Sequence, residues 1–240
     1  MEDKKMPKEI ERKFLIHKPT EQQLKLLDIV SDTDIEQTYL KRKNPLVERR
    51  VRLRGNIIDG YKFYYTEKSE EFFGVRDENE YIISPEEYLK LLTEKDNQLV
   101  PIKKNRKCFN FENKLFELDI YPFSDKYAIL EVELKSMDED IKLPPLDIVK
   151  EVTGIPEFSN ENLSRNMCFP DECWIYEVGE EIPEVLGSGS NFYNVVNTKD
   201  EKKAFELLKE CNRNYIRRYR RLNGYRVYQW YDFDAHEWRE

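Results

Sequence analysis

The sequence is poor in the residues on which many catalytic sites depend. Only two histidines, His17 and His236, occur among 240 residues, so a Ser-His-Asp or Cys-His arrangement has little to draw on. Only eight glycines are present, and none falls in a phosphate-binding loop or a dinucleotide fingerprint. If this protein handles phosphate, side chains rather than a glycine-rich backbone must hold it.

Cysteines and long apolar stretches are scarce as well. The four cysteines, Cys108, Cys168, Cys173 and Cys211, form no CxxC pair, so we expect neither a thiolate zinc site nor a disulfide framework. The N-terminus lacks the apolar core of a signal peptide, and no apolar run approaches membrane-spanning length. We therefore expect a cytoplasmic protein that does not enter a membrane.

The chain is rich in charged and aromatic residues. Charged residues make up 37% and hydrophobic ones 39%, with 15 Tyr and 13 Phe, which is a globular composition with an unusual need for charge. The net charge of −8 argues against a general nucleic-acid coat, although a local basic groove can coexist with an acidic total. The length suits one domain of about 150 to 170 residues plus an appendage.

The charged residues alternate with others along several stretches, as they do in β-strands. In the opening stretch, a strand puts Glu9, Glu11 and Lys13 on one face. Seven further strands are predicted at residues 35–42, 49–54, 61–68, 76–83, 102–111, 114–121 and 127–135. Helices are predicted to begin at the Thr20 capping box and at Ser84, from Pro144-Pro145 to about Val152, and within residues 159–166.

The aligned positions form two sets of opposite charge. The bases are Lys13, Arg52, Arg54, Lys68, Arg76, Lys104, Arg106 and Lys135, and the acids are Glu9, Glu11, Glu78, Glu80, Glu117, Asp119, Glu131 and Glu133. One interpretation is the wet face of an antiparallel sheet, where cross-strand pairs contribute about 0.2 to 1 kcal/mol each. The other is a barrel with a charged interior, in which cations hold a polyanion and carboxylates hold Mg²⁺ or Mn²⁺.

The ordered set of motifs resembles the CYTH family, the triphosphate tunnel metalloenzymes, over about residues 6–166. The stretch Glu9 to Leu15 resembles the family's ExExK signature. Later motifs follow in the family's order: Arg52-Leu53-Arg54, Thr66-Glu67-Lys68, Arg76 with Glu78 and Glu80, Lys104 with Arg106, Glu117 with Asp119, and Glu131-Val132-Glu133. The resemblance implies an α+β fold, in which an eight-stranded antiparallel β-barrel with peripheral helices forms a tunnel for a triphosphate and a divalent metal.

The resemblance also implies roles for individual residues. The phosphates would be held by Lys13, Arg52, Arg54, Lys68, Arg76, Lys104 and Arg106. Metal ligands would be Glu9, Glu11, Asp119, Glu131 and Glu133; among these residues, Glu131 and Glu133 would act in catalysis together with Lys13. Supporting residues would be Glu78, Glu80, Glu117 and Lys135. The metal, Mg²⁺ or Mn²⁺, would activate water for attack on the terminal phosphorus.

The resemblance leaves the activity open between three alternatives. The short IERKFL opening is most similar to bacterial-type inorganic triphosphatases, so hydrolysis of tripolyphosphate or of a nucleoside or organic triphosphate ranks first. A class IV-type adenylate cyclase that makes cyclic AMP is the second alternative. A non-catalytic module that binds a nucleotide or polyphosphate is the third, because fold analogy alone cannot choose the activity.

The C-terminal part follows the barrel domain expected at residues 1–169. Residues 170–198 are predicted to be a linker or loop-rich segment, and residues 199–240 an extension with a helix from Asp200 to about Leu222, closed by Asn223-Gly224 and followed by an aromatic segment. From Cys211 to Tyr231 there is no acidic residue, while six arginines lie among aromatic residues. We expect a helix whose aromatics dock on the barrel; nucleic-acid binding through phosphate contacts and base stacking is the alternative.

Overall fold

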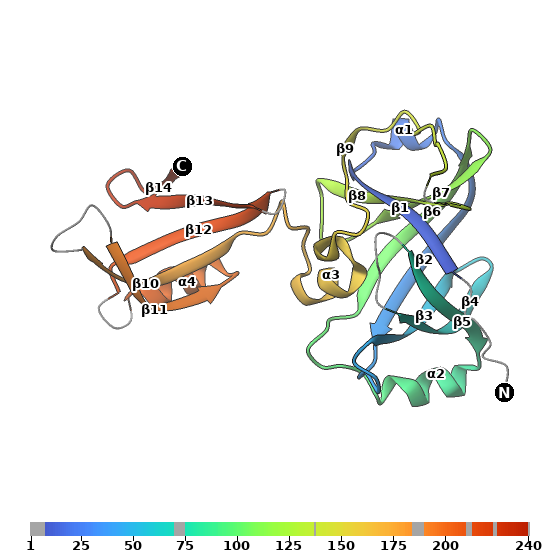
Figure 1. Ribbon diagram of the computed structural model, residues 1–240, viewed down its shortest axis with the longest axis horizontal. Helices are drawn as coiled ribbons and strands as arrows, with labels where there is room; N and C mark the ends of the chain where they lie inside the picture. Colours follow the sequence, from blue (N-terminus) through green and yellow to red (C-terminus); the bar gives the residue numbers. More distant parts are fainter. Residues whose placement is uncertain are drawn as a thin grey trace. The chain divides into compact units, whose positions relative to one another are not determined.

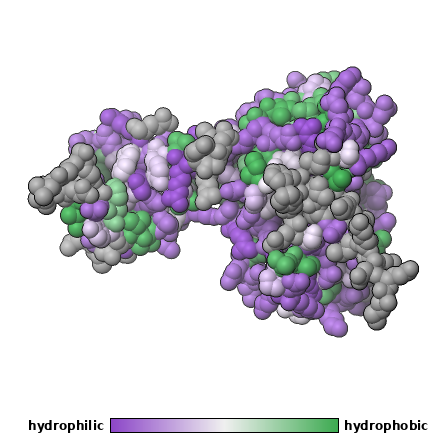
Figure 2. All heavy atoms as spheres, viewed as in Figure 1, coloured by the Kyte–Doolittle hydropathy of each residue, from purple (hydrophilic) through white to green (hydrophobic). Residues whose placement is uncertain are grey.

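The computed structural model describes residues 8–69, 75–136, 138–183, 190–209, 213–222 and 225–239. The chain divides into two compact units, Met1–Met167 and Cys168–Glu240, each with its own β-sheet (Figure 1). Hydrophilic residues dominate the visible surface, with only small apolar patches between them (Figure 2). Within the described ranges, no helix has the length and apolar character needed to cross a membrane.

The N-terminal unit is built from antiparallel strands. Its described strands are β1 (Lys8–His17), β2 (Asp28–Tyr39), β3 (Val47–Asn56), β4 (Gly60–Ser69), β5 (Val75–Ile83), β6 (Ile102–Phe111), β7 (Lys114–Ile120), β8 (Tyr127–Glu133) and β9 (Ile148–Glu151). They pair in the order β5-β4-β3-β2-β6-β7-β8-β1-β9. The eight strands predicted from the sequence are all present, but β2, predicted at residues 35–42, begins seven residues earlier, at Asp28.

Strand β1 pairs with both β8 and β5, but the two ladders differ in length. It pairs with β8 over seven residues, from Glu11↔Glu133 to His17↔Tyr127. Its pairing with β5 covers only three residues, Lys8 to Ile10, and β9 pairs with residues 14–16. Because β8 takes one edge of β1, β5 and β9 share the other edge. We predicted a closed eight-stranded barrel; the described sheet is not closed by a full ladder, since β9 pairs along part of the edge that closure would need.

Strand β9 replaces a helix that the sequence predicted. The Pro144-Pro145 cue indicated a helix through about Val152, and this prediction is wrong. Residues 148–151 pair instead with β1, where Leu15 lies opposite Lys150 and Phe14 opposite Glu151. The β-branched residues Ile148 and Val149 suit a strand, and the available edge of β1 gives their backbone groups partners.

The helices of this unit begin where their caps predict. Thr20 forms the expected capping box for α1 (Glu21–Leu24), although α1 is shorter than expected because Val30 already belongs to β2. Ser84 caps α2 (Pro85–Leu92), and Ser159 caps α3 (Asn160–Asn166). Capping therefore gave the starts of the helices more accurately than periodicity gave their ends.

Apolar side chains form the outer face of the N-terminal sheet. One cluster, which contains Phe14, Phe116 and Leu130, lies over β1, β6, β7 and β8. A second cluster joins Val51 and Tyr65 to Tyr88 of α2, which lies beside β3 and β4 (Figure 1). Because side chains alternate along a strand, burying these residues outward turns their charged neighbours to the opposite face.

The C-terminal unit is a second antiparallel sheet with one helix. Its elements are β10 (Ile175–Pro183), β11 (Ser190–Thr198), α4 (Glu201–Lys209), β12 (Tyr215–Leu222), β13 (Tyr225–Asp232) and β14 (Glu237–Arg239), with strand order β11-β10-β12-β13-β14. Residues 170–198, expected to be loop-rich, thus contain two strands. The helix predicted from Asp200 to Leu222 ends at Lys209, and β12 follows. Residues 184–189, with most of the predicted Gly-Ser loop, and the predicted Asn223-Gly224 turn lie outside the described residues.

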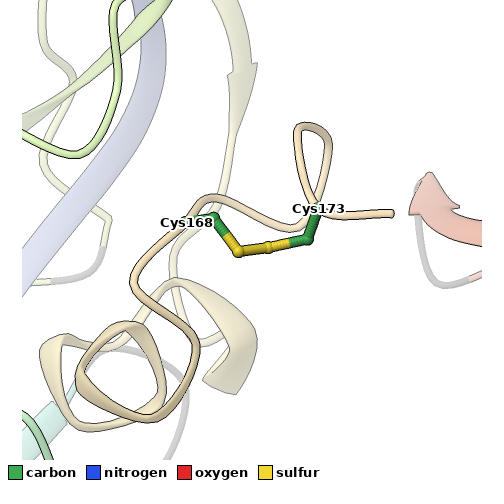
Figure 3. Close-up of a disulfide and its surroundings, with 2 residues drawn as sticks. All are labelled: Cys168 and Cys173. Carbon is green, nitrogen blue, oxygen red and sulfur yellow. A yellow bond between two sulfur atoms is a disulfide. The ribbon is translucent and has the colours of Figure 1, made fainter. Parts of the chain in front are cut away.

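Helix α4 packs on one face of this sheet. A disulfide lies in the segment that precedes β10. Ala204 of α4 is buried with Val178 of β10 and Ile216 of β12. Cys168 and Cys173 form a disulfide with a Cα–Cα distance of 5.9 Å (Figure 3). We expected no disulfide framework from the sequence; among the described cysteines the structure has this one bridge, between residues only five apart.

Candidate active site in the N-terminal sheet

The strand register places the charged residues predicted for the site on one face of the sheet. Lys13 lies opposite Glu131, and Arg106 opposite Asp119. Their sequence neighbours, such as Phe14 and Leu118, belong to the apolar cluster on the other face. We call the charged side the inner face; the described residues assigned to it are Glu11, Lys13, Gln37, Arg50, Arg52, Arg54, Thr66, Lys68, Glu78, Glu80, Lys104, Arg106, Glu117, Asp119, Glu131 and Glu133. The predicted alternation is therefore confirmed for these strands.

Asp119 is the centre of the most deeply buried cluster on the inner face. Its side chain is 0% exposed and accepts two hydrogen bonds from Arg106, each 2.6 Å long, and one from Lys104. Arg106 also donates to Glu131 Oε2 over 2.7 Å and to Glu117. Burial opposes the charge of Arg106, yet attraction to Asp119 and Glu117 raises its pKa well above its usual value.

Glu131 joins this cluster to the opening strand. The Nζ atom of Lys13 lies 3.0 Å from Glu131 Oε1 and 3.4 Å from Glu11 Oε1. Burial alone would raise the pKa of Glu131, but the charges of Lys13 and Arg106 hold it well below its usual value. Glu131 is therefore ionised at neutral pH although it is buried.

A second cluster lies on β3, β4 and β5. The Nη1 atom of Arg52 is 3.4 Å from Glu80 Oε2, and the Thr66 hydroxyl donates to the same oxygen over 2.7 Å. Lys68 forms an ion pair with Glu78, whose other oxygen lies 3.5 Å from Arg50 Nη2. Each carboxylate of β5 thus neutralises part of the charge on the two strands before it.

Two cationic side chains of the inner face are buried, which disfavours their charged forms. Burial and the nearby charge of Arg106 lower the pKa of Lys104 to about 8. Burial and the nearby charge of Arg50 lower the pKa of Arg52 to about 10. Both shifts show that the carboxylates only partly compensate the buried positive charge, and an added anion would favour the protonated forms.

Buried polar atoms without hydrogen-bond partners also lie on the inner face. Neither Arg52 Nε nor Gln37 Oε1 has a hydrogen-bond partner within the described residues. Gln37 lies opposite Arg52 in the β2–β3 ladder, and its Nε2 donates to the Tyr39 hydroxyl over 2.6 Å. Buried polar atoms normally have partners, so this pair of atoms marks a position where a ligand or water would be favoured.

Four predicted residues are either exposed or have side chains outside the described residues. Lys135 lies beyond the end of β8 with an exposed side chain, and its backbone amide donates to Glu139. Glu133 is exposed at the last position of β8, opposite Glu11. Glu9 and Arg76 are register partners across β1 and β5, but their side chains lie outside the described residues.

Three inner-face residues were not proposed for the site from the sequence. Arg50 and Thr66 each contact a carboxylate of β5, and Gln37 faces Arg52. The same period of two that selected Arg52 also selects Arg50 and Thr66. Gln37 gave no such signal, because a neutral amide does not stand out in a search for aligned charges.

The predicted metal ligands do not converge in this conformation. Among the residues that the structure describes, no three histidine, cysteine, aspartate or glutamate side chains are close enough together to hold a metal ion. Asp119 and Glu131 are paired instead with Lys104, Arg106 and Lys13. The chemistry of the donors does suit a hard cation, because Glu11 and Glu133 are cross-strand neighbours with carboxylate oxygens.

The N-terminal unit is thus an antiparallel sheet with a buried face that is rich in cations. The family profile of the CYTH domain matches residues 7–164, well over half of the chain. The chain therefore belongs to the CYTH family, as the ordered motifs indicated.

Solved structures give further likenesses. The inorganic triphosphatase NE1496 shares 26% identity with a TM-score of 0.44, covering 65% of this chain and 94% of that chain. The PH1012 protein from Pyrococcus horikoshii OT3 shares 23% identity with a TM-score of 0.40, covering 53% and 80%. HpAC1 from Hippeastrum, a putative adenylyl cyclase described as having a dominant triphosphatase activity, shares 16% identity with a TM-score of 0.38, covering 53% and 80%. A comparison with curated proteins gives no match.

Proposed function

We propose that the N-terminal unit hydrolyses a triphosphate, either inorganic tripolyphosphate or a nucleoside or organic triphosphate, with the help of Mg²⁺ or Mn²⁺. The observation that carries this proposal is the buried positive charge on the inner face of a CYTH domain. Lys104 and Arg52 have lowered pKa values there although Lys104 pairs with Asp119 and Arg52 with Glu80. A triphosphate supplies the negative charge and the acceptor oxygens that these groups lack.

The residues of the inner face have complementary tasks in this proposal. Arg52, Arg54 and Arg106 present planar guanidinium groups that can bind phosphate oxygens in pairs, and Lys68 and Lys104 add point charges. Burial of Arg52, Lys104 and Arg106 strengthens these contacts, since charges interact more strongly away from water. Lys13 is held between Glu11 and Glu131 and would contact the phosphate nearest β1.

The carboxylates near β1 fit the role of metal ligands chemically. Glu11 and Glu133 lie opposite each other, and Glu131 is kept ionised by its neighbours. We assign the metal to these residues together with Glu9 and Asp119. Asp119 and Glu131 would turn toward it as phosphate takes over the cations that these two carboxylates now bind. A divalent cation held there would neutralise phosphate charge and lower the pKa of an attacking water molecule.

A substrate panel tests the proposal. Phosphate release from tripolyphosphate, nucleoside triphosphates and thiamine triphosphate should be measured with Mg²⁺, with Mn²⁺ and with chelator. We expect metal-dependent release from at least one substrate. Folded protein that releases phosphate from none of them under any metal would overturn the proposal.

The same panel separates hydrolysis from the two alternatives. Cyclic AMP formed from ATP would identify a cyclase. Tight triphosphate binding in calorimetry, with no product from any substrate, would identify a binding module. Phosphate release without cyclic AMP is the outcome that we expect.

A further inference from the structure

The arginine-rich segment, expected to be a helix up to Leu222, forms strands β12 and β13, and part of its arginine and aromatic residues gather on one face of the second sheet. The register of β10, β12 and β13 puts Arg217 opposite both Glu177 and Trp230, and Tyr219 opposite Tyr228. We call this side the arginine–aromatic face; it comprises Phe192, Tyr215, Arg217, Tyr219, Arg226, Tyr228 and Trp230. Helix α4 packs against the opposite face through Ala204, beside Val178 and Ile216.

Aromatic rings surround the guanidinium group of Arg217. Its Cζ atom lies 4.4 Å from the ring centroid of Tyr228, 5.1 Å from Phe192, 5.3 Å from Trp230 and 5.4 Å from Tyr215. These are cation–π distances. The rings and the guanidinium thus pack as one cluster, in which Tyr215 is buried and Trp230 is exposed.

A second arginine extends this surface toward solvent. The Cζ atom of Arg226 lies 4.5 Å from the ring centroid of Tyr219. The Arg226 side chain is 46% exposed, and Trp230 is 41% exposed. Arg226 and Trp230 lie on the same strand face with Tyr228 between them, and tryptophan and arginine are residue types enriched where partners bind.

The negative charge on this face lies beneath the arginines. Glu177 is only 5% exposed and accepts a hydrogen bond from Arg217 Nε over 2.5 Å, while Arg226 Nη1 lies 3.7 Å from its other oxygen. The buried carboxylate fixes the orientation of Arg217, and in the middle of the face the charge presented outward is that of the guanidinium groups. At the margins the register adds Glu181, opposite Phe192, and Asp232 and Glu237, which pair with Arg239. The middle of the face therefore complements a partner that offers both negative charge and flat rings.

We propose that the arginine–aromatic face binds single-stranded nucleic acid. Unpaired bases would stack on Trp230 and Tyr228, and the phosphates beside them would contact Arg226 and Arg217. Single strands combine accessible base faces with a phosphate at every step, whereas a duplex hides its base faces within the stack. This inference concerns the C-terminal sheet alone and does not depend on the activity proposed for the inner face.

Fluorescence anisotropy with the full chain tests the inference. The probe is a labelled 15-nucleotide RNA with a 5′-hydroxyl, so that no triphosphate can bind to the inner face. We expect Trp230→Ala and Arg226→Ala each to weaken binding about tenfold, as loss of one stacked base contact or phosphate contact does. Trp230→Phe keeps a ring and should stay within about threefold of the natural chain.

Matched controls make the result specific to this face. Arg165→Ala removes an arginine of similar exposure, 43%, from the N-terminal unit and should leave RNA affinity unchanged. Circular dichroism must show that each variant is folded; Arg226→Ala keeps the test valid if Trp230→Ala unfolds, because Arg226 lies at the surface. Affinity should also fall as salt rises, as it does for phosphate contacts.

Several outcomes would overturn the inference. They are absence of RNA binding at low salt, an equal loss in Arg165→Ala, and tighter binding of a 15-base-pair duplex than of the single strand. A single-stranded DNA probe that binds as well as RNA would support it and identify the bases and phosphates, rather than the ribose, as the recognised groups. A protein dimer that is lost in Trp230→Ala, without RNA binding, would show that a second copy covers this face and would also overturn it.

Discussion

Arg106 in the N-terminal unit and Arg217 in the C-terminal unit both lie in the middle of an antiparallel sheet, but in different surroundings. Arg106 is enclosed by three carboxylates, those of Asp119, Glu117 and Glu131. Arg217 has one carboxylate, Glu177, and four aromatic rings. The same side chain is thus stabilised mainly by ionic groups in one unit and mainly by rings in the other.

The two surroundings differ in the ligands that they suit. Carboxylates can be replaced by phosphate oxygens, can turn toward a metal ion and can be protonated, so the inner face suits exchange of ionic ligands. Aromatic rings keep their shape and cancel no charge, and Arg217 and Arg226 share the single carboxylate of Glu177, so the arginine–aromatic face suits flat ligands that carry charge. Burial makes the ionic arrangement more sensitive to the loss of one partner, because an unpaired charge in the interior costs several kcal/mol.

Replacing Asp119 with alanine should have the largest effect on stability. The change leaves Lys104 and Arg106 buried without their shared carboxylate, and we expect a loss of about 3 to 5 kcal/mol in the free energy of unfolding. Urea denaturation followed by far-UV circular dichroism measures the loss. All three tryptophans belong to the C-terminal unit, so their fluorescence should keep its transition.

Asp125→Ala is the matched control for this prediction. Asp125 is a fully exposed aspartate a few residues further along the same unit, and within the described residues its only ion-pair contact is a 3.9 Å pair with Lys18. Its loss should change stability by less than about 0.5 kcal/mol. If Asp119→Ala were as mild as this control, the cluster around Arg106 would not depend on its carboxylate.

Two variants of the inner face should separate catalysis from binding. We expect Glu133→Gln to lower kcat about 100-fold with little change in KM, because the amide is a poor metal ligand. Arg54→Ala should instead raise KM for tripolyphosphate about tenfold, since it removes a charged hydrogen-bond donor. Steady-state kinetics measures both.

Lys103→Ala provides the control for these kinetics. Lys103 is the exposed sequence neighbour of Lys104 and pairs with Glu36 over 3.3 Å. Its loss should leave both kinetic constants within twofold. Equal changes in kcat and KM in Glu133→Gln and in Arg54→Ala would contradict the division of roles between them.

The sequence predicted the N-terminal strands well because a local rule determines them. Each strand alternates apolar and charged residues, and burial of one face fixes the other. The rule failed for β9, where pairing with β1 overrode the helix cue at Pro144-Pro145. It also failed for β12, since arginines occupy both of its faces: Arg217 contacts aromatic rings on one, and Arg218 lies over Trp174 and Trp238 on the other.

The sequence predicted which residues belong to the candidate site better than it predicted which of them contact one another. Aligned charges identified Lys13, Arg106 and Glu131, which the structure brings together. No local pattern shows that Asp119 is completely enclosed, because its neighbours Lys104 and Arg106 come from another strand. The arrangement of rings around Arg217 likewise depends on β10, β11 and β13, which meet only in the folded sheet.

In the C-terminal unit, loss of the single carboxylate should be milder than loss of Asp119. Glu177→Gln removes the charge beside Arg217 but keeps the four rings and a hydrogen-bond acceptor. We expect a loss of about 1 to 2 kcal/mol, measured by tryptophan fluorescence during urea denaturation. Glu206→Gln, at an exposed position of α4, is the control and should have no measurable effect. A loss as large as that in Asp119→Ala would mean that the rings contribute little.

The smallest expected effect is the loss of stability in acid that comes from the ion pair of Glu80 with Arg52 on the inner face. Burial would raise the pKa of Glu80, but Arg52 and Thr66 lower it below the usual 4.5. Because the folded-state pKa is the lower one, the unfolded chain binds more protons as pH falls, and the stability that Glu80 provides above pH 4.5 is lost below it. We expect the difference in unfolding free energy between the natural chain and Glu80→Gln to shrink by less than about 1 kcal/mol from pH 6 to pH 3.5.

Far-UV circular dichroism at a series of pH values measures this difference in the N-terminal unit. Glu206→Gln serves again as the control, since an exposed glutamate of the other unit should not alter the acid response of the sheet around Arg52. The rings of Phe192 and Trp230 beside Arg217 carry no acid, so their contribution to the C-terminal unit should persist over the same range. A Glu80→Gln chain that loses stability in acid as steeply as the natural chain would show that the ion pair with Arg52 is not the source of the sensitivity, and that the inner face tolerates protonation as the aromatic surroundings do.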